Sequence, residues 1–319
     1  MSRTRKVLLF IFGSLTFVIV GLPYVLPLTG SAPVDPVTLA DADGAFVQAG
    51  DTRLYYEKAG SGAVPIVLVH GFGASSFSWR NNLRPIAEAG YTVYAPDMRG
   101  FGLSDKSWDG TMAHAAQADR LAAFMDAVKI DRAVLAGNSM GGNIIAHFAL
   151  KYPNRVRGLI FVDAAIFTGA PNAAVVSTIL EFPPIRRWGQ HAVRFLLADD
   201  TRNADTIKSA WYDPAKLSDD VLIGYRRALR TPDWDLGLLA MSRDSGQNDI
   251  SGRLAEITAP TLIIWGEHDT WINPANGPRL QQAIAGSRLI VIPQAGHVPH
   301  EEQPEEFNRQ IIEFLEEIN

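Results

Sequence analysis

Short apolar runs recur along most of the chain and predict a sheet of mostly parallel strands. Each run is continuous, which is typical of a strand that is buried on both of its faces. These runs lie at 65–69, 91–95, 132–135, 158–163, 261–265 and 287–292. Two further strand-like segments, 45–48 and 53–57, flank a short turn that contains Gly50 and Asp51.

Segments with helical spacing alternate with these runs. Apolar residues at three- and four-residue steps predict helices at 112–128, at 143–150 and at the C-terminus, from about Phe307 to Ile318. Strands that alternate with helices predict an α/β fold, in which helices cover both faces of a mostly parallel central sheet.

One long segment, 166–255, contains no strand-like run and divides the core into two parts, 45–165 and 256–319. Its many apolar and aromatic residues predict an inserted helical cap, which would line a largely apolar pocket. The cap also carries a pair of arginines at 186–187 and a cluster at 226–230. These side chains would either contact anionic lipid headgroups or belong to solvated helix faces, and a solvated face is the expectation.

An apolar stretch without any charged residue, 7–28, stands apart from the globular pattern. As a helix that rises about 1.5 Å per residue it would reach about 33 Å, close to the thickness of a bilayer's hydrocarbon core. A glycine and two prolines in its last part predict that the regular helix ends near Leu22. We therefore predict a transmembrane anchor at 1–28 and a linker at 29–44, with a cleaved signal peptide as the alternative.

The charges around this stretch indicate its orientation. Arg3, Arg5 and Lys6 precede it, whereas the first basic residue after it is Arg53. The positive-inside rule then keeps the N-terminus in the cytoplasm and places the globular part on the outer side of the membrane. If the segment is cleaved instead, the protein would be secreted or periplasmic.

Charge and cysteine content exclude several classes of function. The chain of 319 residues has a formal net charge of −5 and no cysteine. Without a basic surplus, nucleic acid is not expected as a partner. Without cysteine, disulfides, thiolate metal sites and a thiol nucleophile are excluded.

No histidine–carboxylate grouping has a convincing metal spacing and no dinucleotide fingerprint is complete, so neither a metal nor a cofactor is expected. The oligomeric state is not indicated.

The segment Gly137-Asn138-Ser139-Met140-Gly141 joins a predicted strand to a predicted helix. Strand, tight turn and helix is the context of a nucleophile elbow, in which a strained turn lifts the serine hydroxyl above the sheet. Glycines on both sides let the strand and the helix approach closely. The alternative is a glycine-rich turn that happens to hold a serine.

Three further motifs each follow a predicted strand: His70-Gly71-Phe72-Gly73, Gly266-Glu267-His268-Asp269 and Gly296-His297. With these motifs and the elbow in this order, the chain resembles the α/β-hydrolase fold family from Ala45 to its end. The resemblance implies a catalytic triad of Ser139, Asp269 and His297. It also implies an oxyanion hole that is formed by the backbone N–H groups of Phe72 and Met140, whose side chains would line the acyl side of the pocket.

A serine hydroxyl becomes a good nucleophile when a base takes its proton, and a histidine with a pKa near neutrality can take and return that proton. The aspartate fixes the histidine tautomer and stabilises the imidazolium. Asp163 also ends a predicted strand and is the alternative acid. His300 is expected to be a partly exposed loop residue, and His70 to shape the oxyanion loop through packing and hydrogen bonds. Asp97 is expected to brace the neighbouring loops, together with the nearby Arg99.

The ordered triad, the apolar cap and the short linker predict hydrolysis of carboxylic esters with apolar acyl groups. The chain is also similar to membrane-anchored monoacylglycerol lipases, which have an N-terminal span ahead of a Ser-Asp-His core. The expected partner is a small-molecule ester or a lipid. The elbow sequence also resembles that of hydrolases that cleave carbon–carbon bonds of ring-fission products, but those usually follow the catalytic histidine with tryptophan, and here Val298 follows His297. Perhydrolysis on the same triad, or a slow-turnover ligand-binding receptor of the same fold, are further alternatives.

Overall fold

The structure is a computed structural model that describes residues 2–167 and 172–318. Eight strands form one sheet in the order β1-β2-β4-β3-β5-β6-β7-β8. The first two strands are antiparallel to their neighbours, and the others are parallel. The strands are β1 Gly44–Ala49, β2 Thr52–Ala59, β3 Pro65–Val69, β4 Thr92–Pro96, β5 Ala133–Asn138, β6 Val156–Val162, β7 Thr261–Gly266 and β8 Arg288–Ile292. The predicted α/β class is confirmed.

Each face of the sheet has its own apolar core. Along β3, Val67 and Val69 belong to one core whereas Ile66 and Leu68 belong to the other, because successive side chains of a strand point to opposite faces. The helices α4 His114–Ala127, α5 Met140–Lys151 and α11 Asn276–Ala283 pack on the first face. On the second face lie α3 Leu83–Glu88 and the last helix, α13 Pro304–Glu317. This double cover explains why the strands read as continuous apolar runs.

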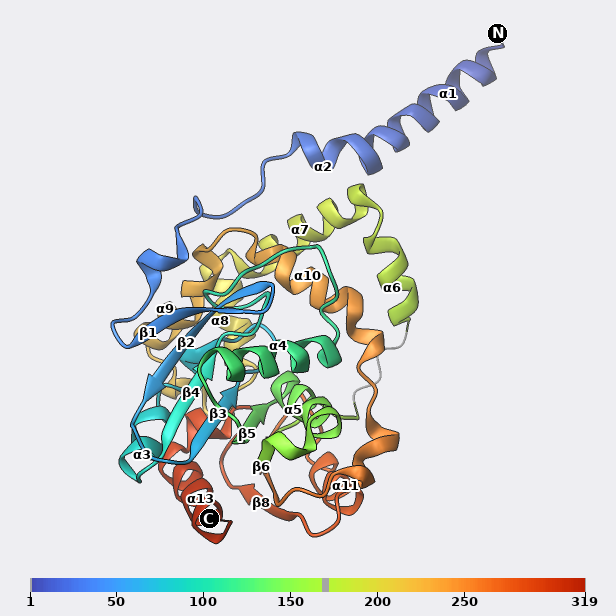
Figure 1. The fold of residues 1–319 in the computed structure, drawn as a ribbon. Coiled ribbons are helices and arrows are strands. Elements are labelled where there is room, and N and C mark those ends of the chain that lie inside the picture. Colours follow the sequence, from blue (N-terminus) through green and yellow to red (C-terminus); the bar gives the residue numbers. More distant parts are fainter. Residues whose placement is uncertain (1, 168–171, 319) are drawn as a thin grey trace.

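The predicted cap segment is helical (Figure 1). Its helices are α6 Ala173–Leu180, α7 Pro183–Leu197, α8 Asp200–Lys208, α9 Asp219–Arg226 and α10 Trp234–Asp244. Side-chain caps start two of them, since Asp199 accepts a hydrogen bond from the Arg202 amide and Ser218 accepts one from the Val221 amide. A further short helix, α12 Pro299–Glu302, lies between β8 and α13.

The N-terminal segment is a helix that projects away from the globular part (Figure 1). It runs as α1 Arg3–Thr16, a π-helical turn Phe17–Gly21 and α2 Leu22–Val25. By length and composition, the range Arg3–Val25 is long and apolar enough to cross a membrane, a test that a signal sequence also passes. The helix continues three residues beyond the expected end near Leu22, because Pro23 occupies the first turn of α2, where its missing N–H is not needed.

The predicted linker is held against the cap. The Val34 amide donates to the Arg230 carbonyl oxygen at 2.8 Å, and Arg227 forms an ion pair with Asp41. Arg227 also lies 3.6 Å from Glu57 of β2. The expectation that the cap arginines belong to solvated helix faces is therefore wrong for Arg227, because this side chain joins the linker to both the cap and the core.

Candidate active site

Ser139 sits in the turn between β5 and α5, with a φ of 52° and a ψ of −114°. A non-glycine residue rarely adopts such a positive φ, so the turn is strained. A Cβ atom on Gly137 would lie 2.4 Å from the carbonyl carbon of Gly141, and one on Gly141 would lie 2.2 Å from the Val69 carbonyl oxygen. The two glycines are required because strand and helix approach this closely, as the sequence predicted.

His297 and Asp269 meet at the carboxyl ends of the last two strands. Nδ1 of His297 lies 2.8 Å from Oδ2 of Asp269, and both side chains are buried. The other carboxylate oxygen accepts hydrogen bonds from the amides of Trp271 and Ile272, at 2.8 and 2.9 Å. A carboxylate at Asp269 requires the proton on Nδ1, so Nε2 remains free to act as the base.

Asp163, the alternative acid, is buried next to this pair. One of its oxygens accepts a hydrogen bond from the Gly266 amide at 2.9 Å, and the other has no hydrogen-bond partner among the described residues. Burial, and then the neighbouring charge of Asp269, raise the pKa of Asp163 well above its usual value. The two aspartates and His297 are close enough to one another to hold a metal ion. However, the short contact between His297 and Asp269 fits a shared proton better than two metal ligands.

The loop after β3 carries the candidate oxyanion hole. Among the described residues, the amides of Phe72 and Met140 donate to no protein acceptor, so both are free for a ligand oxygen. The ring of His70 fixes this loop, because Nδ1 contacts the Gly71 carbonyl oxygen at 2.8 Å and Nε2 accepts a hydrogen bond from the Met98 amide at 3.0 Å. Burial lowers the pKa of His70, so the ring stays neutral. It thus packs and hydrogen-bonds as the sequence predicted.

Asp97 stabilises the loops next to the candidate oxyanion hole through hydrogen bonds to their backbone. Its carboxylate accepts hydrogen bonds from the amides of Ser76 and Leu103, both at 2.6 Å. Arg99 donates to the Asp109 carbonyl oxygen at 2.8 Å and so closes the following loop. The bracing role expected for Asp97 and Arg99 agrees with these contacts.

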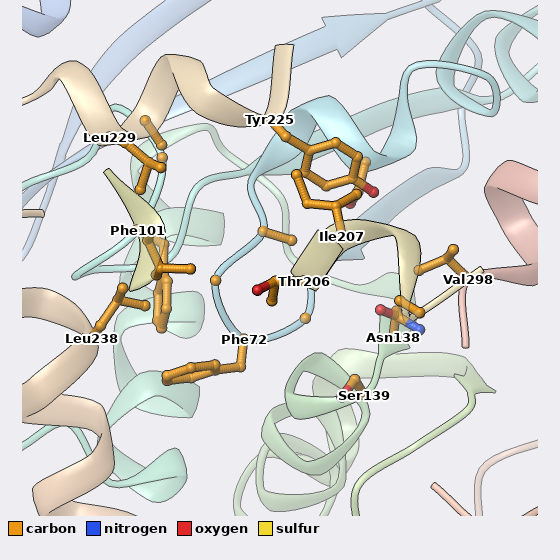
Figure 2. A pocket seen from close by; sticks show the side chains of 18 of the residues that line it. Phe72, Phe101, Asn138, Ser139, Thr206, Ile207, Tyr225, Leu229, Leu238 and Val298 are labelled. Atoms are coloured by element: carbon orange, nitrogen blue, oxygen red, sulfur yellow. The ribbon is translucent and has the colours of Figure 1, made fainter. Parts of the chain in front are cut away.

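A cavity of about 360 Å³ opens above Ser139, and both Ser139 and His297 line it. Figure 2 shows Phe72, Phe101 and Leu238 on one side of the cavity. Apolar side chains from α8, from the 3-10 turn Arg227–Arg230 after α9 and from α10 supply much of the remaining wall, among them Ile207, Leu229 and Trp234. The expectation for Met140 is wrong: its side chain is buried beneath the turn and does not line the cavity.

Comparison with known proteins identifies the family. The profile described as "alpha/beta hydrolase fold" matches residues 64–304. The chain belongs to the α/β-hydrolase fold family.

Among its curated relatives is a 2-hydroxy-6-oxo-6-phenylhexa-2,4-dienoate hydrolase of Comamonas testosteroni. It is 32% identical over 273 residues, which cover 83% of this chain and 92% of the relative. A 2-hydroxy-6-oxononadienedioate/2-hydroxy-6-oxononatrienedioate hydrolase of Paraburkholderia xenovorans is 31% identical over 277 residues, 83% of this chain and 91% of the relative.

Two solved structures extend the comparison. A thermophilic esterase from Thermogutta terrifontis is 26% identical, with a TM-score of 0.71, over 87% of this chain and 99% of that one. A membrane phospholipase A, described as a bacterial virulence factor, is 24% identical with a TM-score of 0.72. The match covers 100% of this chain and 99% of the phospholipase chain, and at this identity it shows the fold alone.

The cap of this hydrolase is fastened to the loops that carry His297 and Asp269. The His297 amide donates to the Ala210 carbonyl oxygen at 2.8 Å, just after α8. Nε1 of Trp271 donates to the hydroxyl of Ser209 at 3.2 Å, and the ring of Trp271 lies 5.1 Å from that of His297. The position of the cap therefore fixes the position of the histidine.

Glu302 completes this attachment, and its role is not visible in the sequence. One carboxylate oxygen accepts a hydrogen bond from the Gly296 amide at 2.6 Å, and the other accepts one from the Tyr212 amide at 2.7 Å. Burial raises the pKa of Glu302, whereas these amide hydrogen bonds oppose that shift. The only signal in the sequence was a pair of glutamates shortly after His297, a pattern that is common on exposed helices.

The expectation that His300 is a partly exposed loop residue is wrong. His300 belongs to α12, is fully buried, and its ring lies 4.3 Å from that of Trp79. Burial lowers the pKa of His300 well below its usual value. The ring is therefore a neutral part of the core that supports the His297 loop. The sequence did not indicate this burial, because Trp79, which packs against His300, lies far away in the chain.

Proposed function

We propose that this hydrolase cleaves carboxylic esters with apolar acyl groups through an acyl-enzyme at Ser139. The observation that carries the proposal is a largely apolar cavity lined by both Ser139 and a histidine that is hydrogen-bonded to a buried aspartate. Such a cavity excludes water from an acyl chain and offers few polar partners to a charged one.

The residues divide the reaction as follows. His297 takes the hydroxyl proton of Ser139 while the oxygen attacks the ester carbonyl, and Asp269 stabilises the resulting imidazolium. The amides of Phe72 and Met140 hydrogen-bond the tetrahedral oxyanion. The imidazolium returns its proton to the leaving alcohol, which leaves an acyl group on Ser139. A water that is activated by His297 then attacks this acyl-enzyme and releases the carboxylic acid, with no metal or cofactor.

Carbon–carbon bond hydrolysis is the second candidate, and the curated relatives favour it. The substrates in their names are a dienoate, a dienedioate and a trienedioate, all of which carry at least one carboxylate. The cavity wall includes Lys106, whose Nζ donates to the carbonyl oxygens of Gly102 and Ser104, both at 2.8 Å, so one N–H remains for a ligand. Burial lowers the pKa of Lys106 to about 8, so the side chain is a cation at neutral pH. Val298, in the position after His297, favours the ester reaction.

A direct comparison of substrates separates the two candidates. The full chain is assayed with nitrophenyl esters of increasing acyl length and with 2-hydroxy-6-oxo-6-phenylhexa-2,4-dienoate, and Ser139→Ala serves as the control. We expect kcat/KM for medium-chain esters to exceed that for the dienoate by at least about tenfold, because the cavity is apolar. A reversed ratio that Lys106→Met abolishes would establish carbon–carbon cleavage. Negligible turnover of both substrates by folded protein would favour a ligand-binding receptor.

We also propose that Arg3–Val25 spans a membrane and that the globular part lies on its outer side. The helix is apolar and projects from the fold, and its side chains are largely exposed. The basic residues Arg3, Arg5 and Lys6 precede it, as the positive-inside rule requires. Carbonate-resistant membrane association of a chain with its intact N-terminal mass is the expected result. A soluble chain that lacks these residues would establish a cleaved signal peptide instead.

A further inference from the structure

Helix α6 and its turn to α7 carry exposed apolar side chains next to the proposed membrane span, and the carboxylate of Glu181 in this turn forms an ion pair with Arg243 at 3.4 Å. Val175, Ile179 and Phe182, which we call the cap corner, have exposed fractions of 57%, 47% and 49%. We propose that the cap corner contacts the bilayer that the N-terminal helix crosses. The proposal rests on the membrane anchoring proposed above, and it does not depend on which substrate the cavity accepts.

Helix α7 fixes the direction in which the span leaves the globular part. Nε1 of Trp188 donates to the carbonyl oxygen of Ile19 at 3.3 Å. Nε2 of His191 lies 2.8 Å from the carbonyl oxygen of Pro23, and Pro23 is buried there. The span therefore does not hang on a free tether, because its last turns are packed along one side of α7.

The order of these contacts identifies the end of α7 that faces the bilayer. Trp188 meets Ile19 of the span, whereas Arg194, further along α7, donates to the Thr29 carbonyl oxygen at 3.0 Å. The N-terminal end of α7 is thus the end nearer to the span. Phe182 directly precedes this end, and Figure 1 shows the α6–α7 turn beside the lower part of the N-terminal helix.

Distances along α7 show how far the cap corner extends towards the bilayer. Phe182 precedes Trp188 by six residues and His191 by nine, so it lies roughly 9 to 14 Å from their contacts towards the bilayer. The headgroup layer on each side of the hydrocarbon core is about 5 to 8 Å thick. If the span leaves the hydrocarbon near Pro23, the cap corner therefore lies on the bilayer side of this layer, in the outer part of the hydrocarbon.

The chemistry of α6 also favours a lipid surface. The helix reads Ala-Ala-Val-Val-Ser-Thr-Ile-Leu and has no charged residue, although most of it is not buried. A helix that faces water normally carries charged residues on its exposed side. Val175 and Ile179 are four residues apart, so they share one face. Trp188 and the basic residues Arg186 and Arg187 follow on α7, as is typical of segments that lie at a membrane interface.

The structure connects this surface to the cavity. Helix α7 starts at the cap corner, and its last residue, Leu197, lines the cavity above Ser139. Contact between the cap corner and the bilayer would hold the cap, and with it the cavity, in one orientation to the lipid. A single span would otherwise leave the tilt of the whole molecule in the bilayer free.

The absence of cysteine from the sequence makes a site-specific test direct. Single cysteines are introduced into the full chain as Ile179→Cys and Phe182→Cys, with Phe12→Cys in the span and Val291→Cys as controls. Val291 is an exposed apolar residue with an exposed fraction of 50%, and it lies on β8, which is an edge strand of the sheet. Each variant is labelled with an environment-sensitive fluorophore and reconstituted into phosphatidylcholine–phosphatidylglycerol vesicles that contain nitroxide lipids.

We expect nitroxide lipids to quench the labels at 179 and 182 at least about threefold more than the label at 291, and deep nitroxides to quench the label at 12. Quenching at 12, with values at 179 and 182 equal to that at 291, would overturn the proposal and leave the anchor standing. Absence of quenching at 12 would overturn both. Labels at 179 and 182 that are shielded in detergent and are not quenched by lipid would assign the cap corner to a second copy of the chain.

A functional comparison uses charge in place of a label. Ile179→Asp combined with Phe182→Asp should lower the rate on a long-chain ester presented in vesicles by about five- to tenfold, and should leave the rate on a soluble short-chain ester unchanged. Val291→Asp should change neither rate. Equal vesicle rates for the corner variant and the Val291 variant would contradict the proposal, and loss of both rates in the corner variant would indicate a folding defect that the labelling experiment avoids.

Discussion

Two aspartates lie beside His297, and their hydrogen-bond partners differ. Asp269 accepts two backbone amide hydrogen bonds and contacts Nδ1 of His297. Asp163 has one unpaired oxygen, and burial raises its pKa, which favours its protonated form. A neutral Asp163 adds no second negative charge next to Asp269.

A matched pair of amide substitutions tests this division of roles. Asp269→Asn should lower kcat/KM on an ester by about 10³- to 10⁴-fold, because an amide favours the wrong histidine tautomer. Asp163→Asn should lower it by less than about tenfold, because a neutral amide replaces a neutral carboxyl group. Ester turnover is measured alongside thermal unfolding. If the two effects were exchanged, Asp163 would be the acid.

Individual site residues were predictable where they belong to a recognisable sequence motif. Ser139, Asp269 and His297 each belong to a motif that follows a predicted strand, and in the structure they lie after the carboxyl ends of β5, β7 and β8. His300 was not predictable, because its burial depends on Trp79, more than two hundred residues earlier in the chain. Contacts of this kind are set by tertiary packing, which local sequence does not encode.

The strands are the elements that the sequence predicted best, because burial on both faces makes each of them a continuous apolar run. The predicted run 65–69 is the observed β3, and 261–265 differs from β7 by one residue. The helix after the elbow was predicted from 143 but begins at Met140. Gly141 and Gly142 conceal its first turn, since they are present for close packing and not for helix propensity.

The attachment between the cap and the histidine loop gives a prediction about an element. Glu302→Gln should lower kcat by about tenfold and the free energy of unfolding by about 1–3 kcal/mol. The reason is that a glutamine amide accepts from only one of the Gly296 and Tyr212 amides, whereas the carboxylate accepts from both. Glu305→Gln, at an exposed neighbouring position, is the control. Equal behaviour of the two variants would show that Glu302 does not hold the loop.

At the scale of the whole molecule, linker, cap and core meet at one ionic cluster. Arg227 of the cap pairs with Asp41 of the linker and lies close to Glu57 of β2. Burial raises the pKa of Glu57 to about 7. The sequence predicted the division into anchor, linker, core and cap, but it gave no sign of this cluster, because the three residues belong to different parts of the chain.

The raised pKa of Glu57 predicts how stability depends on pH. The folded state holds this proton more tightly than the unfolded state, so the group's contribution is full below about pH 4.5 and is lost as pH rises through 7. Glu57→Gln removes this loss. The free energy of unfolding of the variant relative to the native chain should therefore rise between pH 4.5 and 7, by up to about 3 kcal/mol. Urea titrations across this range measure it, and a difference that is constant with pH would contradict the assignment.

The central claim is that the hydroxyl of Ser139 is a nucleophile activated by His297, and covalent labelling tests it most directly. The full chain is treated with a fluorophosphonate probe, and the modified residue is located by peptide mass spectrometry. The account predicts one adduct on Ser139, little or no adduct in Ser139→Ala, and labelling that is slower by about 10³-fold or more in His297→Ala. Labelling that persists in Ser139→Ala, or an adduct on another residue of the native chain, would contradict the account.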